Sequence, residues 1–288
     1  MTSSYSSANS SANSSAYSSA LSAVASWPVT TAAAAIVGPS GVLASIGPVD
    51  DPFYLASVTK PLAALAILVA VEEEAVSLSD AADESLIPGA TLRHLLAHAS
   101  GLAPERPVRS FPPGVRRVYS NVGIELAATL VARGSSIAFS DYLSEAVCAP
   151  LRLTATTLPG SPARDGRSSV ADLSRVVHEL LSPTGLLSVS MLAELSSVQY
   201  PGLRGVLPGF GSQDPNDWGL GFEIRGTKSP HWTGALNSPT TFGHFGQSGT
   251  MLWIDPVARL GLVVLTDRDF GPWAASAWPA LADAVLSV

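Results

Sequence analysis

A serine and a lysine stand three positions apart at the head of a long apolar segment. Ser57-Val58-Thr59-Lys60 is followed by PLAALAILVAV, which predicts a buried helix from Ser57 to about Ala75. On a helix, residues i and i+3 share a face, with Cβ atoms about 5–6 Å apart. The amine can then contact the hydroxyl, and the helix N-terminus offers N–H groups to an oxyanion. The spacing indicates nucleophilic catalysis; a capping serine followed by a surface lysine has the same pattern.

Two further short motifs carry groups that can move protons or bind substrate. Tyr119-Ser120-Asn121 follows a loop rich in Pro and Arg, and His244-Phe245-Gly246 opens a predicted strand. Asn121 is also well placed to cap the apolar helix that follows it. Each motif alone occurs readily by chance, but the three in this order form a specific combination.

The ordered motifs resemble those of the serine β-lactamase and penicillin-binding protein superfamily. The match is to its class C-like branch, which includes the family VIII carboxylesterases and carries S-x-x-K, Y-x-N and K-T-G or H-x-G. The stretch HLLAHASGL over residues 94–102 also looks like a block of that family. The resemblance covers roughly residues 22–288.

This resemblance implies a role for each matching residue. Ser57 would be the acylated nucleophile. Its backbone N–H and that of Gln247 would form the oxyanion hole, in a substrate-binding strand segment that includes His244, Gly246 and Ser248. Asn121 would orient Lys60 and bind the acyl side chain.

Ser57 needs a base, and the candidates are Lys60 as a free amine and Tyr119 as a phenolate. Both have ordinary pKa values near 10. A cationic lysine lowers the pKa of a neighbouring phenol, whereas burial lowers the pKa of the lysine itself. We expect a shared Lys60–Tyr119 base, with Tyr119 protonating the leaving group and activating the water that completes the reaction.

One departure from the family bears on the substrate. His244 stands where β-lactamases carry the Lys of K-T-G, so a permanent positive charge is lost. Lys228-Ser229-Pro230 is a rival third motif, but its proline is unsuited to a central strand, and we expect a solvated loop there. Trp218, Phe210 and Trp232 are candidates to line the acyl pocket or to pack in the core.

These residues and the resemblance favour a serine hydrolase acting on a small-molecule acyl substrate, a carboxylic ester or a short acyl amide. One alternative is a β-lactamase or a D-alanyl-D-alanine-type peptidase acting on β-lactams or cell-wall acyl amides. The other is a non-catalytic protein that retains a penicillin-binding fold.

The elements that must position these residues suggest an α+β fold of the β-lactamase/transpeptidase type. Strands at both chain ends enclose a helical middle, which predicts one antiparallel sheet flanked by helices, with an inserted helical lobe. Hairpins are expected at 29–47 and 244–266, the latter with one turn at 255–256. Helices are expected over five middle segments and at the end of the chain: 92–99, 122–132, 139–147, 170–181, 189–199 and 273–288.

The domain organisation is predicted to be simple. Residues 1–17 form a flexible tail rich in Ser, Ala and Asn, although their four-residue period also suits a helix. Residues 18–288 form one catalytic domain, in which 18–75 and 206–288 build the α/β lobe and 76–205 the helical lobe.

Composition excludes other classes of protein. The 288 residues carry 16 basic and 23 acidic side chains, a net charge of −7, with no basic patch for nucleic acid. The longest apolar run is too short to span a membrane. No metal or cofactor is expected, because His94 and His98 lack a third ligand. A single cysteine, Cys148, suits the cytoplasm. The sequence leaves the oligomeric state open.

Overall fold

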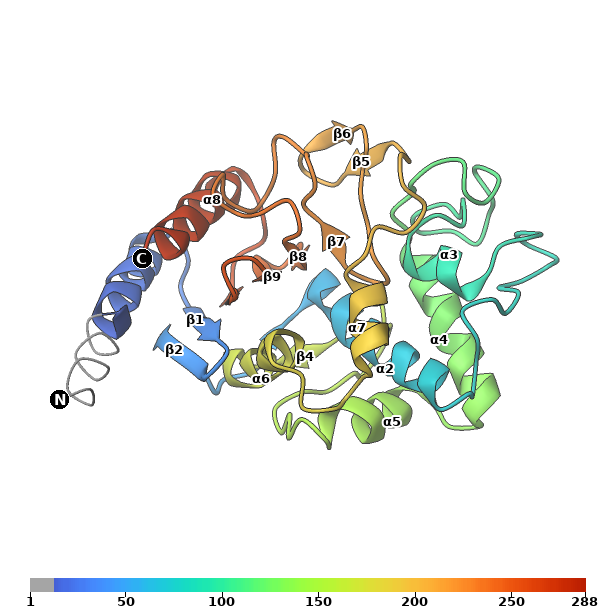
Figure 1. The fold of residues 1–288 in the computed structure, drawn as a ribbon, viewed down its shortest axis with the longest axis horizontal. Coiled ribbons are helices and arrows are strands. Elements are labelled where there is room, and N and C mark those ends of the chain that lie inside the picture. The colour runs from blue at the N-terminus through green and yellow to red at the C-terminus, as the bar shows by residue number, and fades with distance from the viewer. Residues whose placement is uncertain (1–12) are drawn as a thin grey trace.

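The computed structural model describes residues 13–288, and its centre is one antiparallel sheet (Figure 1). Its six strands lie in the order β2-β1-β10-β9-β8-β7. Their bounds are Gly41–Ile46, Ala32–Gly38, Leu260–Thr266, Thr250–Asp255, Phe242–Gly246 and Glu223–Ile224. The first strands of the chain pair directly with its last, so the sheet is built from both ends, as predicted.

The sheet separates two hydrophobic cores because its strands alternate their side chains. On β1, Ala33, Ala35 and Val37 face one core, whereas Ala34 and Ile36 face the other. The first core contains the helices α2 (Thr59–Glu72) and α6 (Val170–Leu181), and the second contains α8 (Pro272–Leu286). Burial on both faces explains why β1 and β10 read as continuous apolar runs.

The helical middle forms the rest of the first core. Its remaining helices are α3 (Leu92–Leu96), α4 (Asn121–Ser135), α5 (Phe139–Leu143), the π-helical η3 (Ser144–Cys148) and α7 (Val189–Leu195). Short strand pairs tie the surrounding loops: β3 (Phe53–Tyr54) pairs with β4 (Arg167–Ser168), and β5 (Gly205–Leu207) pairs with β6 (Gly211–Gln213). Five predicted middle helices are present, two of them three or four residues shorter than expected.

Two predictions about regular structure are wrong. The segment 244–254 is not one strand, because a turn at Gln247–Gly249 divides it into β8 and β9. Residues 13–17 are helical rather than irregular, since a helix covers 13–21 and continues as the 3-10 helix η1 (Ser22–Ser26). Tyr17, Ala20 and Leu21 pack into the second core, which explains the order of this segment. The rest of the predicted tail, residues 1–12, lies outside the described residues.

Between residues 13 and 288, no single helix is long and apolar enough to cross a membrane. By length and composition alone, one sharply bent pair, Asn121–Ser135 with Phe139–Cys148, would pass the same test.

Candidate active site

Ser57 is presented by a sharp turn at the start of α2. It lies in the 3-10 helix η2 (Ala56–Val58), directly after Ala56, whose φ of 45° is unfavourable for a residue with a Cβ. The Thr59 hydroxyl braces this turn, donating to the Ala56 carbonyl at 2.6 Å and accepting from the Gly166 N–H at 2.9 Å. The turn leaves the Ser57 side chain half-buried at the head of the helix.

Lys60 is fully buried beneath Ser57 and surrounded by hydrogen-bond acceptors. Its Nζ lies 3.2 Å from Ser57 Oγ, 2.6 Å from Asn121 Oδ1 and 2.8 Å from the Ala163 carbonyl oxygen. Burial lowers the pKa of the amine to about 7. A neutral amine can donate to the two carbonyl oxygens and turn its lone pair toward the Ser57 hydroxyl.

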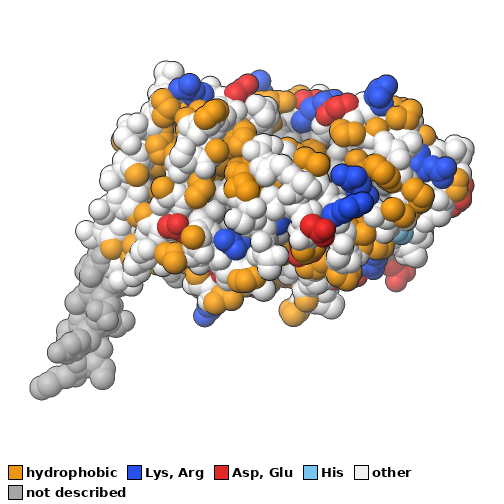
Figure 2. Space-filling model, turned by 90° about the horizontal axis from the view of Figure 1, so that it is seen from above, with side chains coloured by type: hydrophobic (Ala, Val, Ile, Leu, Met, Phe, Trp, Pro, Cys, Tyr) orange, Lys and Arg blue, Asp and Glu red, His pale blue; other side chains and the backbone are white. Residues whose placement is uncertain are grey.

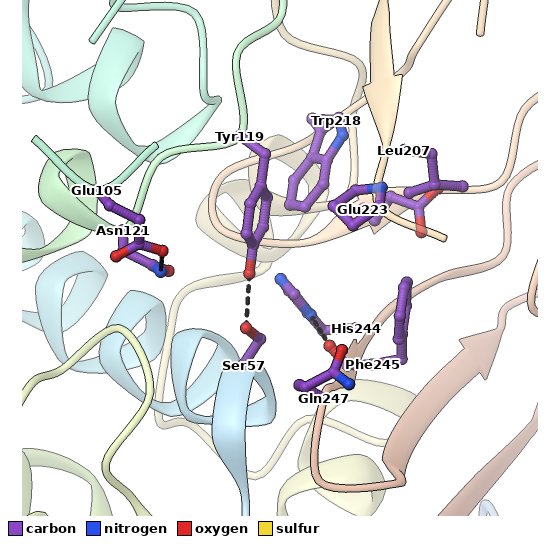
Figure 3. A pocket seen from close by; sticks show the side chains of 11 residues that line it. Ser57, Glu105, Tyr119, Asn121, Leu207, Trp218, Glu223, His244, Phe245 and Gln247 are labelled. Atoms are coloured by element: carbon purple, nitrogen blue, oxygen red, sulfur yellow. Dashed lines mark hydrogen bonds between the residues drawn. The ribbon is translucent and has the colours of Figure 1, made fainter. Parts of the chain in front are cut away.

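Tyr119 is the third side chain of this set and also contacts Ser57. Its hydroxyl donates to Ser57 Oγ at 2.7 Å (Figure 3). The Lys60 amine lies 4.5 Å from the centre of the Tyr119 ring. The rings of His98 and Trp218 pack near it, with centroids 4.7 and 5.8 Å away. Burial raises the pKa of the Tyr119 phenol, so the phenol stays protonated at neutral pH. The two groups thus have opposite tendencies: the amine loses its proton readily and the phenol holds its own.

Asn121 points to Lys60 because its neighbour caps the helix. The Ser120 hydroxyl accepts the Gly123 N–H at 3.1 Å at the N-terminus of α4. The Asn121 amide is therefore free to accept from Lys60 and to donate from Nδ2 to Glu105 Oε1 at 2.5 Å.

Strand β8 forms the opposite wall and passes very close to the segment that carries Ser57. A Cβ at Gly246 would stand 2.4 Å from the Leu55 carbonyl oxygen, so only glycine allows this approach. His244 donates from Nδ1 to the Phe245 carbonyl at 2.7 Å, and burial lowers the pKa of its imidazole to about 3. His244 is therefore neutral, as expected from the sequence.

The last two predicted residues of this wall differ in position. Gln247 lines the pocket, whereas Ser248 does not. The Ser248 hydroxyl donates to the Tyr54 carbonyl at 2.8 Å, which ties the turn after β8 to β3. Ser248 thus holds the loop rather than contacting the cavity.

The predicted solvated loop at Lys228 is wrong, because the Lys228 side chain is completely buried. Its amine lies 2.5 Å from Glu223 Oε1 and also donates to the carbonyls of Asp217 and Ile224. Glu223 further accepts from His231 Nε2 at 2.8 Å and from the Trp232 indole. The sequence did not reveal this burial, because the partner carboxylate belongs to β7, a strand of only two residues that has no recognisable local pattern.

A pocket of about 210 Å³ is lined by Ser57, Tyr119, Asn121, Glu105, His244 and Gln247. Figure 3 shows Ser57 and Tyr119 facing each other, with Asn121 and Glu105 on one side and His244 and Gln247 on the other. The cavity is closed by apolar groups and by one buried carboxylate: Leu207, Pro208, Trp218, Phe245 and Glu223. Of the three predicted aromatic candidates only Trp218 lines it; Phe210 and Trp232 belong to the second core.

Sequence reasoning missed Glu105 and Arg117. Arg117 is buried and donates to the carbonyls of Ala97, Asn216 and Gln199 at 2.6, 3.0 and 2.7 Å, which fixes the segment that presents Tyr119. The one sequence signal for this role was that Arg117 stands two residues before Tyr119. Glu105 offered none, because its contacts are to a helix and a loop distant in sequence.

The remaining histidines next to the site have structural contacts. The His94 Nδ1 lies 2.9 Å from the Thr91 hydroxyl at the start of α3, and His98 packs against Tyr119. Among residues 13–288, no group of three or more His, Cys, Asp or Glu side chains is arranged to hold a metal ion. Cys148 is buried.

Comparison with known proteins gives matches over nearly the whole chain. The family model described as Beta-lactamase matches residues 29–286. The crystal structure of a beta-lactamase from Mycobacterium bovis is 55% identical, with a TM-score of 0.91, and the match covers 93% of this chain and 98% of that one. A hydrolase described as having promiscuous acyltransferase activity, EstCE1, is 16% identical with a TM-score of 0.76, covering 96% and 98%. At that identity, the likeness is one of fold.

More distant relatives carry a peptidase name. A protein of Escherichia coli K12, provisionally named as a D-alanyl-D-alanine carboxypeptidase, is 27% identical over 209 residues. The match covers 57% of this chain and 48% of that protein, so the chain spans about half the length of this relative.

Proposed function

This chain belongs to the beta-lactamase family, and on that basis we propose that it is a serine hydrolase that cleaves carboxylic esters or short acyl amides through an acyl-enzyme on Ser57. One observation carries the proposal: the Ser57 hydroxyl lies within hydrogen-bond distance of both a buried amine and a buried phenol. A nucleophile in contact with both a base and an acid is suited to acyl transfer.

In the proposed acylation, the free amine of Lys60 accepts the Ser57 proton while Oγ bonds to the ester carbonyl carbon. The carbonyl electrons move to oxygen, and the backbone N–H groups of Ser57 and Gln247 are the donors proposed for that oxyanion. As the bond to the alcohol breaks, the Tyr119 hydroxyl protonates the departing oxygen. The proton held on Lys60 then returns to the phenolate.

The proposed deacylation reverses these roles. Water attacks the acyl carbon from the side of Tyr119, and its proton passes to Lys60 by way of the Tyr119 hydroxyl. Ser57 leaves the tetrahedral intermediate and regains a proton from Lys60. Lys60 is the base of the pair, because its pKa of about 7 leaves much of the amine neutral whereas Tyr119 retains its proton.

The charges around the pocket favour esters over β-lactams. A β-lactam or a peptide ending in D-alanine carries a carboxylate, which needs a cationic partner. Here His244 is neutral, Lys228 is buried against Glu223, and the other ionisable side chains of the lining include Glu105 and Glu223. Bringing a carboxylate into this pocket is therefore unfavourable.

The alternative, hydrolysis of β-lactams or cell-wall acyl amides, rests on the names of relatives. The 55% identical protein of Mycobacterium bovis is described as a beta-lactamase, and the Escherichia coli relatives bear the carboxypeptidase name. We place the esterase first because the pocket's charges are a property of this chain, whereas the alternative depends on what other proteins are called. The buried single Cys148 also makes the cytoplasm the compartment that we propose.

A pair of covalent probes distinguishes these functions. We expect a fluorophosphonate to label Ser57, and a penicillin to leave it unlabelled under the same conditions, with intact-mass and peptide mass spectrometry as the readout. Ser57→Ala is the matched control. Efficient labelling by penicillin would place the β-lactam or peptide reaction first, and labelling by neither probe would support a non-catalytic protein.

Removing the Tyr119 hydroxyl tests its role as an acid. Tyr119→Phe keeps the ring that packs on His98 and Trp218 but leaves the departing alcohol without its proton donor. We expect turnover of 4-nitrobenzyl butyrate to fall at least about 10²-fold. Esters with a better leaving group, such as 4-nitrophenyl butyrate, need less protonation and should lose less in acylation. An equal loss in the acylation rates of both esters would assign Tyr119 another role.

A further inference from the structure

The catalytic lysine is linked to the protein surface by a chain of three hydrogen bonds. Lys60 donates to Asn121 Oδ1 at 2.6 Å, and Asn121 Nδ2 donates to Glu105 Oε1 at 2.5 Å. The other carboxylate oxygen, Glu105 Oε2, accepts from Arg164 at 3.0 Å. The side chains of Arg164 and Glu105 are 46% and 56% exposed, whereas Lys60 is fully buried.

The backbone places Glu105 firmly at this position. The Asn121 N–H donates to the Pro104 carbonyl at 2.9 Å, and the Ser120 hydroxyl donates to the Ala103 carbonyl at 2.8 Å. On the opposite loop, Arg164 directly follows Ala163, whose carbonyl accepts from Lys60. Of the two loops that meet at the Glu105–Arg164 ion pair, one contacts the amine directly through Ala163, and the other is linked to it through Asn121.

An asparagine amide is nearly symmetric in shape, so its orientation depends on its partners. If the amide reversed, Nδ2 would face Lys60 and could donate to the lone pair of the neutral amine. That lone pair would then be unavailable to the Ser57 proton. A carboxylate only accepts hydrogen bonds, so Glu105 attracts Nδ2 and leaves Oδ1 facing the amine.

We propose that Glu105 is a positioning residue, which holds the Asn121 amide in the orientation that keeps the Lys60 lone pair directed at Ser57. The inference rests on the proposed use of Lys60 as a base. Burial lowers the pKa of Lys60, and the negative charges of Glu105 and Glu125 partly oppose this by raising it.

Glu125 provides a matched control for the charge. It also lies near Arg164, at 3.9 Å, but Asn121 donates to Glu105 rather than to Glu125. Glu105→Gln removes the charge and keeps a carbonyl acceptor for Nδ2, Glu105→Leu removes both, and Glu125→Gln removes only a charge. Since exposed ion pairs contribute about 0–1 kcal/mol to stability, all three variants should fold.

The first readout is the titration of Lys60 itself. The chain contains only two lysines, so protein labelled with [¹³Cε]-lysine gives two signals, and Lys60→Met assigns them. We expect the pKa of Lys60 to fall in the order wild type, Glu105→Gln, Glu105→Leu, because a reversed amide stabilises the neutral amine further. Equal values in the Gln and Leu variants would overturn the proposal, since both lack the charge.

The second readout is ester hydrolysis across pH. On the high-pH plateau, we expect Glu105→Leu to lose about 10- to 100-fold, mainly in kcat, with Glu105→Gln and Glu125→Gln within about 3-fold of wild type. A Leu variant as active as Glu125→Gln would overturn the positioning role. If wild type hydrolyses no ester while the titration order holds, the proposed function fails and the positioning of Asn121 stands.

Discussion

Replacing Lys60 with methionine should abolish hydrolysis and leave the fold intact. Methionine matches the length of the buried side chain but cannot accept the Ser57 proton. We expect kcat/KM for 4-nitrophenyl butyrate to fall at least about 10³-fold. The melting temperature should stay equal or rise, because the wild-type protein buries a group that prefers water. Activity assays and thermal unfolding on the same preparation check both expectations.

Lys60→Arg separates a base from a positive charge. Arginine keeps the cation and cannot lose its proton in a protein. If Lys60 acts only by attracting the developing oxyanion, this variant retains substantial activity; if it is the base, activity is lost. We expect loss. The larger guanidinium must also fit a fully buried position, so its melting temperature is compared with that of Lys60→Met.

The same role fixes the direction of the pH dependence in the wild-type protein. The free amine is the active form, so kcat/KM should rise as the pH increases through the pKa of Lys60, about 7, and then level off. Tyr119, whose pKa is raised, remains protonated over this range, so its titration should not change kcat/KM near neutral pH.

Replacing Lys228, the second lysine of the chain, should lower the stability of the fold. Lys228→Met leaves Glu223 buried without its cation, in a network where the carboxylate also accepts from His231 and Trp232. Removing one partner of a buried ion pair costs about 3–5 kcal/mol, and we expect the free energy of unfolding to fall by that amount in urea titrations.

A double variant tests whether the loss comes from the uncompensated carboxylate. In Lys228→Met/Glu223→Gln neither member of the former ion pair carries a charge, so we expect part of the stability to return. A double variant less stable than Lys228→Met would contradict this explanation. Lys228→Arg, which a solvated loop would tolerate, should also destabilise the protein, because the lysine side chain has no exposed surface to accommodate a bulkier group.

The ionised Glu223 also predicts how stability depends on pH. Burial alone would raise the pKa of this carboxyl, but His231 and Lys228 outweigh burial and hold the pKa well below its usual range. A lowered folded-state pKa contributes stability above the unfolded value, near 4.3, and this contribution is lost as the pH falls below it.

The sequence was sufficient wherever the determining interactions are local. The helix over Val170–Leu181 was predicted to the residue, because Ser169 caps it and its apolar spacing is regular. The segments that carry Ser57, Lys60, Tyr119 and His244 are distant in sequence, and it was the family resemblance of the three motifs that predicted a shared site for them.

The failures arose where distant segments determine the structure. The turn within 244–254 is the exception: it ends at Gly249, whose φ is 74°, and a glycine in an otherwise alternating run is a local turn signal. Lys228 and Glu105 are different: their hydrogen-bond partners come from other elements of the fold, and neither residue stands in a recognisable pattern. No periodicity or spacing could have shown that one is buried or that the other contacts Asn121.

The burial of both lysines has a practical consequence. Positions 1–12 contain no lysine, and Lys60 and Lys228 are covered, so the basic side chains in blue in Figure 2 are arginines. Reagents that acylate amines, such as succinimidyl esters, cyanate or reducing sugars, find no lysine on the folded surface. Modification of either lysine therefore reports the opening of the fold, and its rate offers a measurement of unfolding that requires neither denaturant nor substrate.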